Sequence, residues 1–225
     1  MTSSVVGQLI LKDWRLNRLL IVLSVALGLV ALFVAQFGSE LARLFGTVWF
    51  FVSLIVLGSI LPGTAIVSER KKQTLAFIMS LPVSSVQYSL AKMASIWVMF
   101  LVPWLTLLIS AVVLVATRNI VPHGIIPMLL IVAVLPLIGF CLISSAALLV
   151  GESEGALVAA TIVCNSSYWF AFYLLCHIPS LAANWSRPVA VWNPAAFITL
   201  SAELGFIALI VGLTLFFQSR KRSFI

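Results

Sequence analysis

Six long apolar runs divide this sequence, and they constrain its fold more than any other feature. A helix needs about 20 apolar residues to cross the roughly 30 Å hydrocarbon core of a bilayer. The runs that meet this requirement are residues 19–37, 45–67, 93–116, 125–150, 156–176 and 195–217. Hydrophobic residues make up 63% of the chain and charged residues only 8%, which excludes a water-soluble domain. We therefore predict an all-α polytopic membrane protein, in which residues 1–225 form one transmembrane domain of six helices.

The basic residues predict how these spans are oriented. If both chain ends and the segments after the second and fourth spans share one side, that side holds ten Lys and Arg residues and the other side three. The ten are Lys12, Arg15, Arg18, Arg70, Lys71, Lys72, Lys92, Arg220, Lys221 and Arg222, and the three are Arg43, Arg118 and Arg187. By the positive-inside rule the first side is cytoplasmic. We expect a multi-pass protein of the cell (inner) membrane with cytoplasmic termini, including a tail at 218–225. The net charge of +7 then reflects orientation and not nucleic-acid binding.

Residues 1–18, before the first run, have the pattern of an amphipathic helix. One side of this helix would carry the apolar residues Val6, Leu9, Ile10 and Trp14. Lys12 and Arg15 would lie on another side. This pattern predicts a helix that lies in the membrane interface, with Trp14 at headgroup depth. A frayed tail is the alternative, whereas the following run is too long for most signal peptides.

Residues 68–92, between the second and third runs, combine charge with helix-capping and amphipathic patterns. Ser68 can cap a helix whose first residue, Glu69, suits the positive end of the helix dipole. One face of that helix would carry Leu75, Ile78 and Met79. The pattern predicts a short amphipathic helix parallel to the membrane.

The same segment also contains the signals that end this helix and begin the next. Pro82 stops the first helix, because it lacks a backbone N–H and forces the preceding residue into an extended conformation. Ser84 and Gln87 have the spacing of a capping box, so the third span begins at once. Tyr88 and Lys92 follow about one turn apart, where a snorkelling ammonium group at the membrane boundary is expected.

Two further connections carry signals. Glu152 and Glu154 alternate with Gly and Ser between the fourth and fifth runs, which suits either an exposed tight turn or an acidic contact for a cytoplasmic partner. Residues 178–195 are mostly apolar but interrupted by three prolines, and they contain Trp185 and Trp192, a residue type that is enriched at membrane interfaces. This composition predicts a pair of short re-entrant helices on the outer side, and an ordinary loop anchored by its tryptophans is the alternative.

Several of these residues together resemble the permease subunit of type-2 ATP-binding-cassette transporters, a class of exporters. The matching residues are Glu69-Arg70, Thr74-Leu75, Leu81-Pro82-Val83-Ser84, Tyr88 and Lys92, together with Lys12-Asp13-Trp14-Arg15 before the first span. The chain departs from the family pattern at Gln73, where the family usually has Gly. The order of basic helix, six spans and cytoplasmic contacts also resembles the family over the whole chain.

The resemblance implies a function and partners. Residues 68–92 would contain a coupling helix that receives the push of an ATPase subunit through Glu69, Arg70, Thr74, Leu75, Ile78, Met79, Leu81 and Pro82. Glu152 and Glu154 would form the second cytoplasmic contact. The chain has no GxxxxGK[ST] motif, so ATP and Mg²⁺ would be held by a separate ATPase polypeptide, and this chain would not be an enzyme by itself. Six spans are half of such a transporter, which implies a second copy or a related permease.

Polar residues inside the predicted spans are the candidates for a translocation path. Asn165, Ser166 and Ser167 either line this path or a dimer interface, or form hydrogen bonds between helices. Glu203 is either an intramembrane acid, which would cost about 2.5 to 3.5 kcal/mol at mid-membrane depth, or an interfacial residue paired with Arg187 or His177. An intramembrane ionisable group is a functional hypothesis by default. Few charges in the spans favour a lipophilic or amphipathic substrate such as a lipid, peptide or hydrophobic antibiotic.

Two other classes of protein remain open. A membrane-embedded enzyme would need a nucleophile with a base, or a set of metal ligands, within the bundle. The sequence has no HExxH motif, and both histidines lie in predicted outer loops. A membrane scaffold or sensor would use the same amphipathic segment to bind a different cytoplasmic partner.

Overall fold

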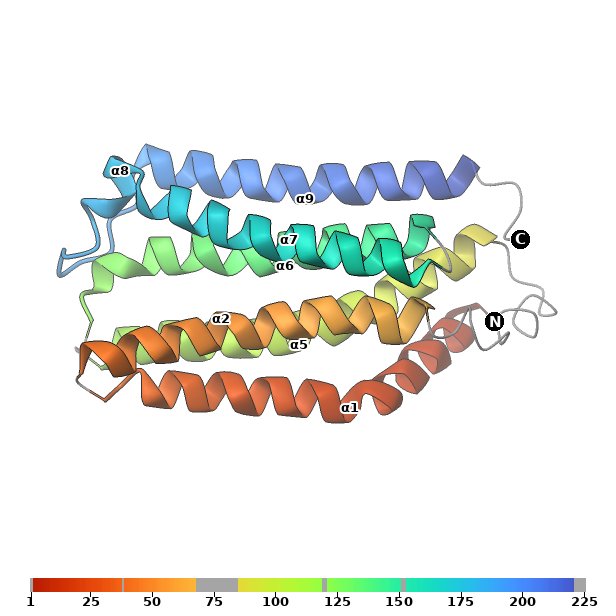
Figure 1. Ribbon diagram of the computed structural model, residues 1–225, viewed down its shortest axis with the longest axis horizontal. Coiled ribbons are helices and arrows are strands. Elements are labelled where there is room, and N and C mark those ends of the chain that lie inside the picture. The colour runs from red at the N-terminus through yellow and green to blue at the C-terminus, as the bar shows by residue number, and fades with distance from the viewer. Residues whose placement is uncertain (1, 38, 68–84, 119–120, 151–152, 221–225) are drawn as a thin grey trace.

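The computed structural model describes residues 2–37, 39–67, 85–118, 121–150 and 153–220. In these ranges the chain forms six long helices that run side by side, and no strand (Figure 1). The long helices are α1 (Thr2–Val34), α2 (Glu40–Pro62), α5 (Ser85–Thr117), α6 (Ile126–Val150), α7 (Glu154–Cys176) and α9 (Pro194–Arg220). Three short elements are a π turn at Gly63–Val67, a 3-10 turn at His123–Ile125 and α8 (Pro179–Ala182). The predicted all-α fold is confirmed.

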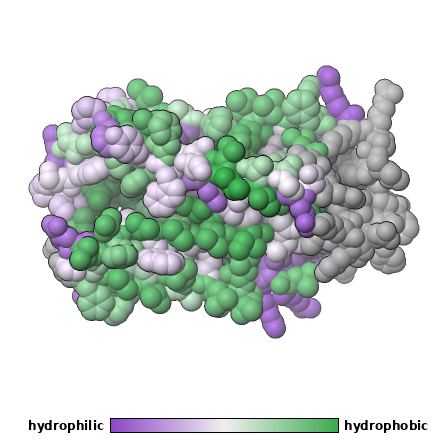
Figure 2. All heavy atoms as spheres, viewed as in Figure 1, coloured by the Kyte–Doolittle hydropathy of each residue, from purple (hydrophilic) through white to green (hydrophobic). Residues whose placement is uncertain are grey.

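All six long helices are apolar enough to cross a membrane. The candidate spans have 23 to 28 residues and are Leu11–Val34, Glu40–Val67, Lys92–Thr117, His123–Leu149, Glu154–Cys176 and Pro194–Arg220. Their outward side chains are apolar as well: Phe170 and Ile198, for example, are 64% and 69% exposed. Apolar residues cover most of the middle of the molecule in Figure 2. Such a surface suits lipid contact, so the chain is a multi-pass membrane protein.

Polar caps fix where three of the long helices begin. The side chains of Ser39, Ser153 and Asn193 each accept a hydrogen bond from the backbone N–H three residues further on, at 3.2, 3.3 and 2.8 Å. Glu40 and Glu154 follow two of these caps, where a carboxylate suits the positive end of the helix dipole. These local signals explain why α2, α7 and α9 begin near the predicted positions.

The N-terminal helix has features that the sequence pattern did not predict. Residues 2–34 form a single helix, with no break between the expected interfacial helix and the first span, and the N-terminal part of α1 bends (Figure 1). Lys12 and Arg15 are exposed, as the pattern predicts. Trp14 does not face outward, because it packs against buried side chains of the bundle. The inward face also carries two polar residues, Asp13 and Asn17, which the amphipathic pattern did not place there.

The connection between α7 and α9 also differs from its prediction. A pair of re-entrant helices was expected, but this segment holds one helix of a single turn, α8. The buried Leu181 anchors α8 to the core, and Gly124 donates a backbone hydrogen bond of 3.0 Å to Arg187. Four residues are too few to form a re-entrant helix pair, so the segment is a loop with one helical turn that closes this end of the bundle.

The centre of the bundle is built around α6. In the most apolar stretch of α6, 61% of residues are buried, compared with 6% in α7. Phe140 of α6 stacks on Phe100 of α5 with ring centroids 4.3 Å apart, and Gly58 of α2 lies against the Phe100 ring and the Cβ atom of Phe140. The bundle therefore has a well-packed interior formed by α2, α5 and α6, and a peripheral helix, α7.

Two ends of the bundle are used below. The α2–α5 end is where α2 ends and α5 begins, and its described residues flank residues 68–84. The α1–α2 end is the opposite one, where α1 ends, α2 begins and α8 lies (Figure 1).

Candidate functional site

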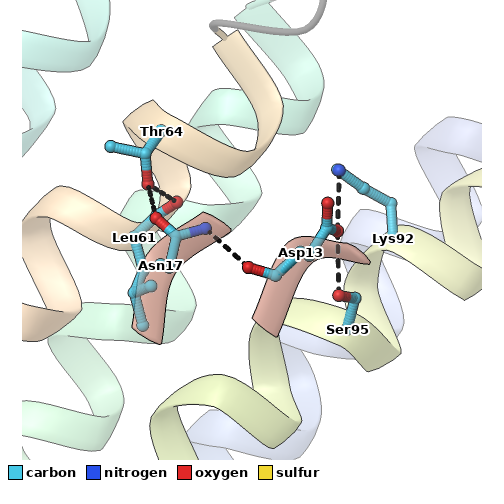
Figure 3. Close-up of polar contacts among 6 residues, drawn as sticks. All are labelled: Asp13, Asn17, Leu61, Thr64, Lys92 and Ser95. Carbon is cyan, nitrogen blue, oxygen red and sulfur yellow. Dashed lines mark hydrogen bonds and ion pairs between the residues drawn. The ribbon is translucent and has the colours of Figure 1, made fainter. Parts of the chain in front are cut away.

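A group of five polar side chains lies at the α2–α5 end, four of them buried and one, Thr64, exposed. Its members, called the polar cluster below, are Asp13, Asn17, Thr64, Lys92 and Ser95 (Figure 3). They come from three helical segments that are distant in sequence. Polar side chains in the interior of a membrane protein are uncommon and costly, so this cluster is the first candidate for a functional site.

A buried ion pair forms one half of the cluster. The ammonium Nζ of Lys92 lies 2.8 Å from the Asp13 carboxylate oxygen Oδ2, and the two side chains are 3% and 2% exposed. Ser95, one turn further along α5, donates its hydroxyl to the same oxygen at 2.9 Å. Residues three apart on a helix share a face, which is why both donors reach one carboxylate. This half of the cluster ties α1 to the beginning of α5.

Asn17 forms the other half, one turn along α1 from Asp13. Its amide Nδ2 donates to the Asp13 carbonyl at 3.0 Å, and its Oδ1 accepts the hydroxyl of Thr64 at 2.9 Å. Thr64 belongs to the π turn Gly63–Val67, which follows directly on Pro62 at the end of α2. Single π turns in helices often occur at functional sites. This half of the cluster ties α1 to the end of α2.

The arrangement has a geometric consequence for the segment in between. Residues 68–84 are flanked by Val67 and Ser85, and the nearest members of the cluster on each side are Thr64 and Lys92. Both flanks are therefore bound to two positions of α1 that lie only one helical turn apart. A displacement of either flank must stretch these bonds or move α1 with it.

The position of Lys92 corrects a prediction. A snorkelling ammonium at the membrane boundary was expected, but Lys92 is buried and paired with Asp13. The signal for this pair was present in the sequence, because Asp13 is the one acid among Lys12, Arg15 and Arg18. Its partner is 79 residues away, so spacing alone could not identify it.

Most of the predicted coupling residues lie outside the part of the chain that the structure describes. These are Glu69, Arg70, Thr74, Leu75, Ile78, Met79, Leu81, Pro82 and, in the second contact, Glu152. Glu154 is described: it is exposed and is the first residue of α7.

The three polar residues predicted for the translocation path do not converge on one point. Asn165 is half-buried and forms a hydrogen bond of 3.3 to 3.4 Å with Ser59 of α2. Ser166 and Ser167 are exposed on the outside of α7. Asn165 therefore forms a hydrogen bond between two helices, which was the alternative to a lining of the translocation path. Of the three residues, only Ser166 and Ser167 face away from the chain.

Glu203 lies inside the bundle and not at its surface. It belongs to the third turn of α9, is 9% exposed, and its Oε2 has no hydrogen-bond partner among the described residues. It forms no ion pair with Arg187 or His177, both of which are exposed. The structure therefore buries Glu203 among the helices and does not pair it with either of these two residues.

The buried face of α9 carries further polar residues that sequence reasoning missed. Thr214 donates its hydroxyl to Ser145 of α6 at 2.7 Å, and Gln218 donates its amide to the carbonyl of Leu148 at 2.7 Å. Glu203, Thr214 and Gln218 recur at intervals of eleven and four residues, a helical spacing that could have identified this face. These bonds hold α9 against α6.

The fold defines the class to which this chain belongs: a multi-pass helical membrane protein. In this chain the polar cluster binds α1 to both flanks of residues 68–84. Comparisons with protein-family models, with curated proteins and with solved structures found no match.

Proposed function

We propose that this chain is the membrane-spanning permease subunit of an ATP-driven ABC transporter that exports a lipophilic or amphipathic substrate. The observation that carries the proposal is the polar cluster, which binds α1 to both flanks of residues 68–84. The sequence of that segment resembles the coupling loop of type-2 permeases, from Glu69 to Lys92. A loop that receives force needs flanks that move together, and the polar cluster connects the two flanks through α1.

The proposed mechanism follows from this geometry. A separate ATPase subunit, holding ATP and Mg²⁺, docks on residues 68–84 and on Glu154 at the cytoplasmic side. When its nucleotide-binding domains close, they push on residues 68–84. The polar cluster then makes α1, α2 and α5 move together. Two permease chains, moved in the same way, reopen toward the outside. The charge asymmetry supports this orientation, because ten of the thirteen basic residues lie on the loop side.

The test is ATP-driven transport by the reconstituted complex. Cross-linking from a cysteine at Arg70, followed by mass spectrometry, identifies the ATPase, and the complex is then reconstituted in liposomes. We expect Glu69→Lys to uncouple ATP hydrolysis from transport or to dissociate the ATPase. The matched control is Glu40→Lys, which reverses an exposed acid at the opposite end of the bundle.

Two outcomes would contradict the proposal. If Glu69→Lys assembled and transported like the unmodified chain, the coupling assignment would lose its basis. If the cross-linked partner were not an ATPase, the scaffold or sensor function would replace the transporter.

A further inference from the structure

A cavity of about 350 Å³ lies at the α1–α2 end, away from the polar cluster. Its walls come from α1, α2, α5, α6 and α7 and are apolar over most of their area, with side chains such as Phe50, Leu114 and Met128. Cavities of this size are typical of small-ligand sites.

Two arginines also line this cavity. Arg43 belongs to the first turns of α2 and is half-buried, and Arg118 follows the end of α5 and is exposed. Neither forms an ion pair with a described residue, and no carboxylate lines the cavity. The remaining polar lining residues, Gln36 and Thr47, are uncharged. The site is therefore a largely apolar space with two positive charges.

Membrane orientation does not explain these two charges. The proposed topology places only Arg43, Arg118 and Arg187 on the outer side, where the positive-inside rule predicts few basic residues. Two of the three nevertheless line the same cavity, although they are 75 residues apart in sequence. Planar guanidinium groups suit bidentate binding of phosphate and carboxylate groups.

We propose that this cavity binds an anionic amphiphile, with its alkyl chain between the helices and its phosphate or carboxylate head at Arg43 and Arg118. The apolar walls favour an alkyl chain, because each buried methylene contributes about 0.8 kcal/mol. The two arginines select an anionic head over a neutral or cationic one. As the substrate class of the exporter, this inference rests on the proposed function, whereas the binding site itself does not.

Binding of dodecyl phosphate tests the proposal. The purified full chain in a neutral maltoside detergent is titrated with radiolabelled dodecyl phosphate, and competition by dodecanol, dodecyltrimethylammonium and inorganic phosphate is measured. We expect saturable binding that none of the three displaces effectively. Arg43→Gln and Arg118→Gln should each weaken binding about tenfold or more, the loss expected for a charge-assisted hydrogen bond.

Two matched variants control for indirect effects. Arg187→Gln removes an exposed arginine at the same end that does not line the cavity, and it should leave binding unchanged. Val115→Trp fills the cavity from α5 and should weaken binding while helix content is retained. Equal binding by the unmodified chain and the two cavity arginine variants would overturn the proposal. Effective competition by inorganic phosphate would also overturn it, because it would indicate a simple anion site.

The binding assay contains no ATPase, so its result is separate from the coupling test. Glu69→Lys should bind dodecyl phosphate normally. Loss of ATP-driven coupling with binding intact would affect only the proposed function. A chain that transports but does not bind the amphiphile would contradict only the cavity assignment.

Discussion

The buried ion pair of the polar cluster gives the sharpest prediction. Asp13→Asn removes the carboxylate charge but keeps a side chain of nearly the same shape. The Lys92 ammonium, which is only 3% exposed, then loses the carboxylate that lies 2.8 Å from it. Removing one partner of a buried pair typically costs about 3 to 5 kcal/mol. We therefore expect Asp13→Asn to lower the free energy of unfolding by an amount in this range.

The double variant Asp13→Asn with Lys92→Met separates charge from packing. Both charges are then absent, the methionine replaces most of the length of the Lys92 side chain, and the introduced asparagine keeps an oxygen that can accept the hydroxyl of Ser95. Replacing a complete buried pair is often neutral or stabilising. The double variant should therefore be more stable than either single variant.

The assay is equilibrium unfolding in mixed micelles of SDS and a neutral detergent, followed by circular dichroism. Glu40→Gln is the control, because substitution of an exposed acid usually changes stability by less than about 0.5 kcal/mol. The reasoning is refuted if Asp13→Asn unfolds like Glu40→Gln, or if the double variant is less stable than both single variants.

Three other features give predictions of their own. A Cβ atom at Gly46 would lie 2.6 Å from a backbone oxygen of α1. Gly46→Ala should therefore destabilise the chain by about 1 to 3 kcal/mol in the same unfolding assay. Gly205→Ala is the control, because a Cβ atom there would meet open space, and it should not destabilise the chain. Thr214→Val removes the bond to α6 and should cost about 0.6 to 1.7 kcal/mol in that assay, and an unchanged stability would show that the bond contributes nothing. In a cysteine-free background, Val189→Cys should react with an impermeant thiol reagent added to intact cells and Lys71→Cys should not, and the opposite pattern would invert the topology.

The six spans could be predicted because the information for them is local. Apolar composition over about 20 residues decides whether a segment enters the bilayer, and Ser39 and Ser153 cap helices through bonds to residues three positions away. The packing of the N-terminal helix is not contained in these local patterns. Residues 2–34 form one continuous helix, in which Asp13 is buried and Trp14 packs against the core.

The candidate sites depend on long-range contacts, which the sequence pattern does not contain. Lys92 could be assigned to the membrane boundary or to the interior, and only the position of Asp13 decides between them. Glu203 is buried, and its burial depends on how α9 packs against the neighbouring helices. The cavity near Arg43 and Arg118 requires five helices to be placed together, so no local motif indicates it.

The distance in sequence between Asp13 and Lys92 has a consequence for the order of assembly. Asp13 is synthesised with the first span, but its partner follows 79 residues later. At about 5 to 20 residues per second, a ribosome needs roughly 4 to 16 s to produce the interval. During this time α1 and α2 can associate as a hairpin while the carboxylate still lacks its counter-ion. The ion pair can form only after the beginning of the third span has been made, so this tether between α1 and α5 is absent while the first two spans are synthesised.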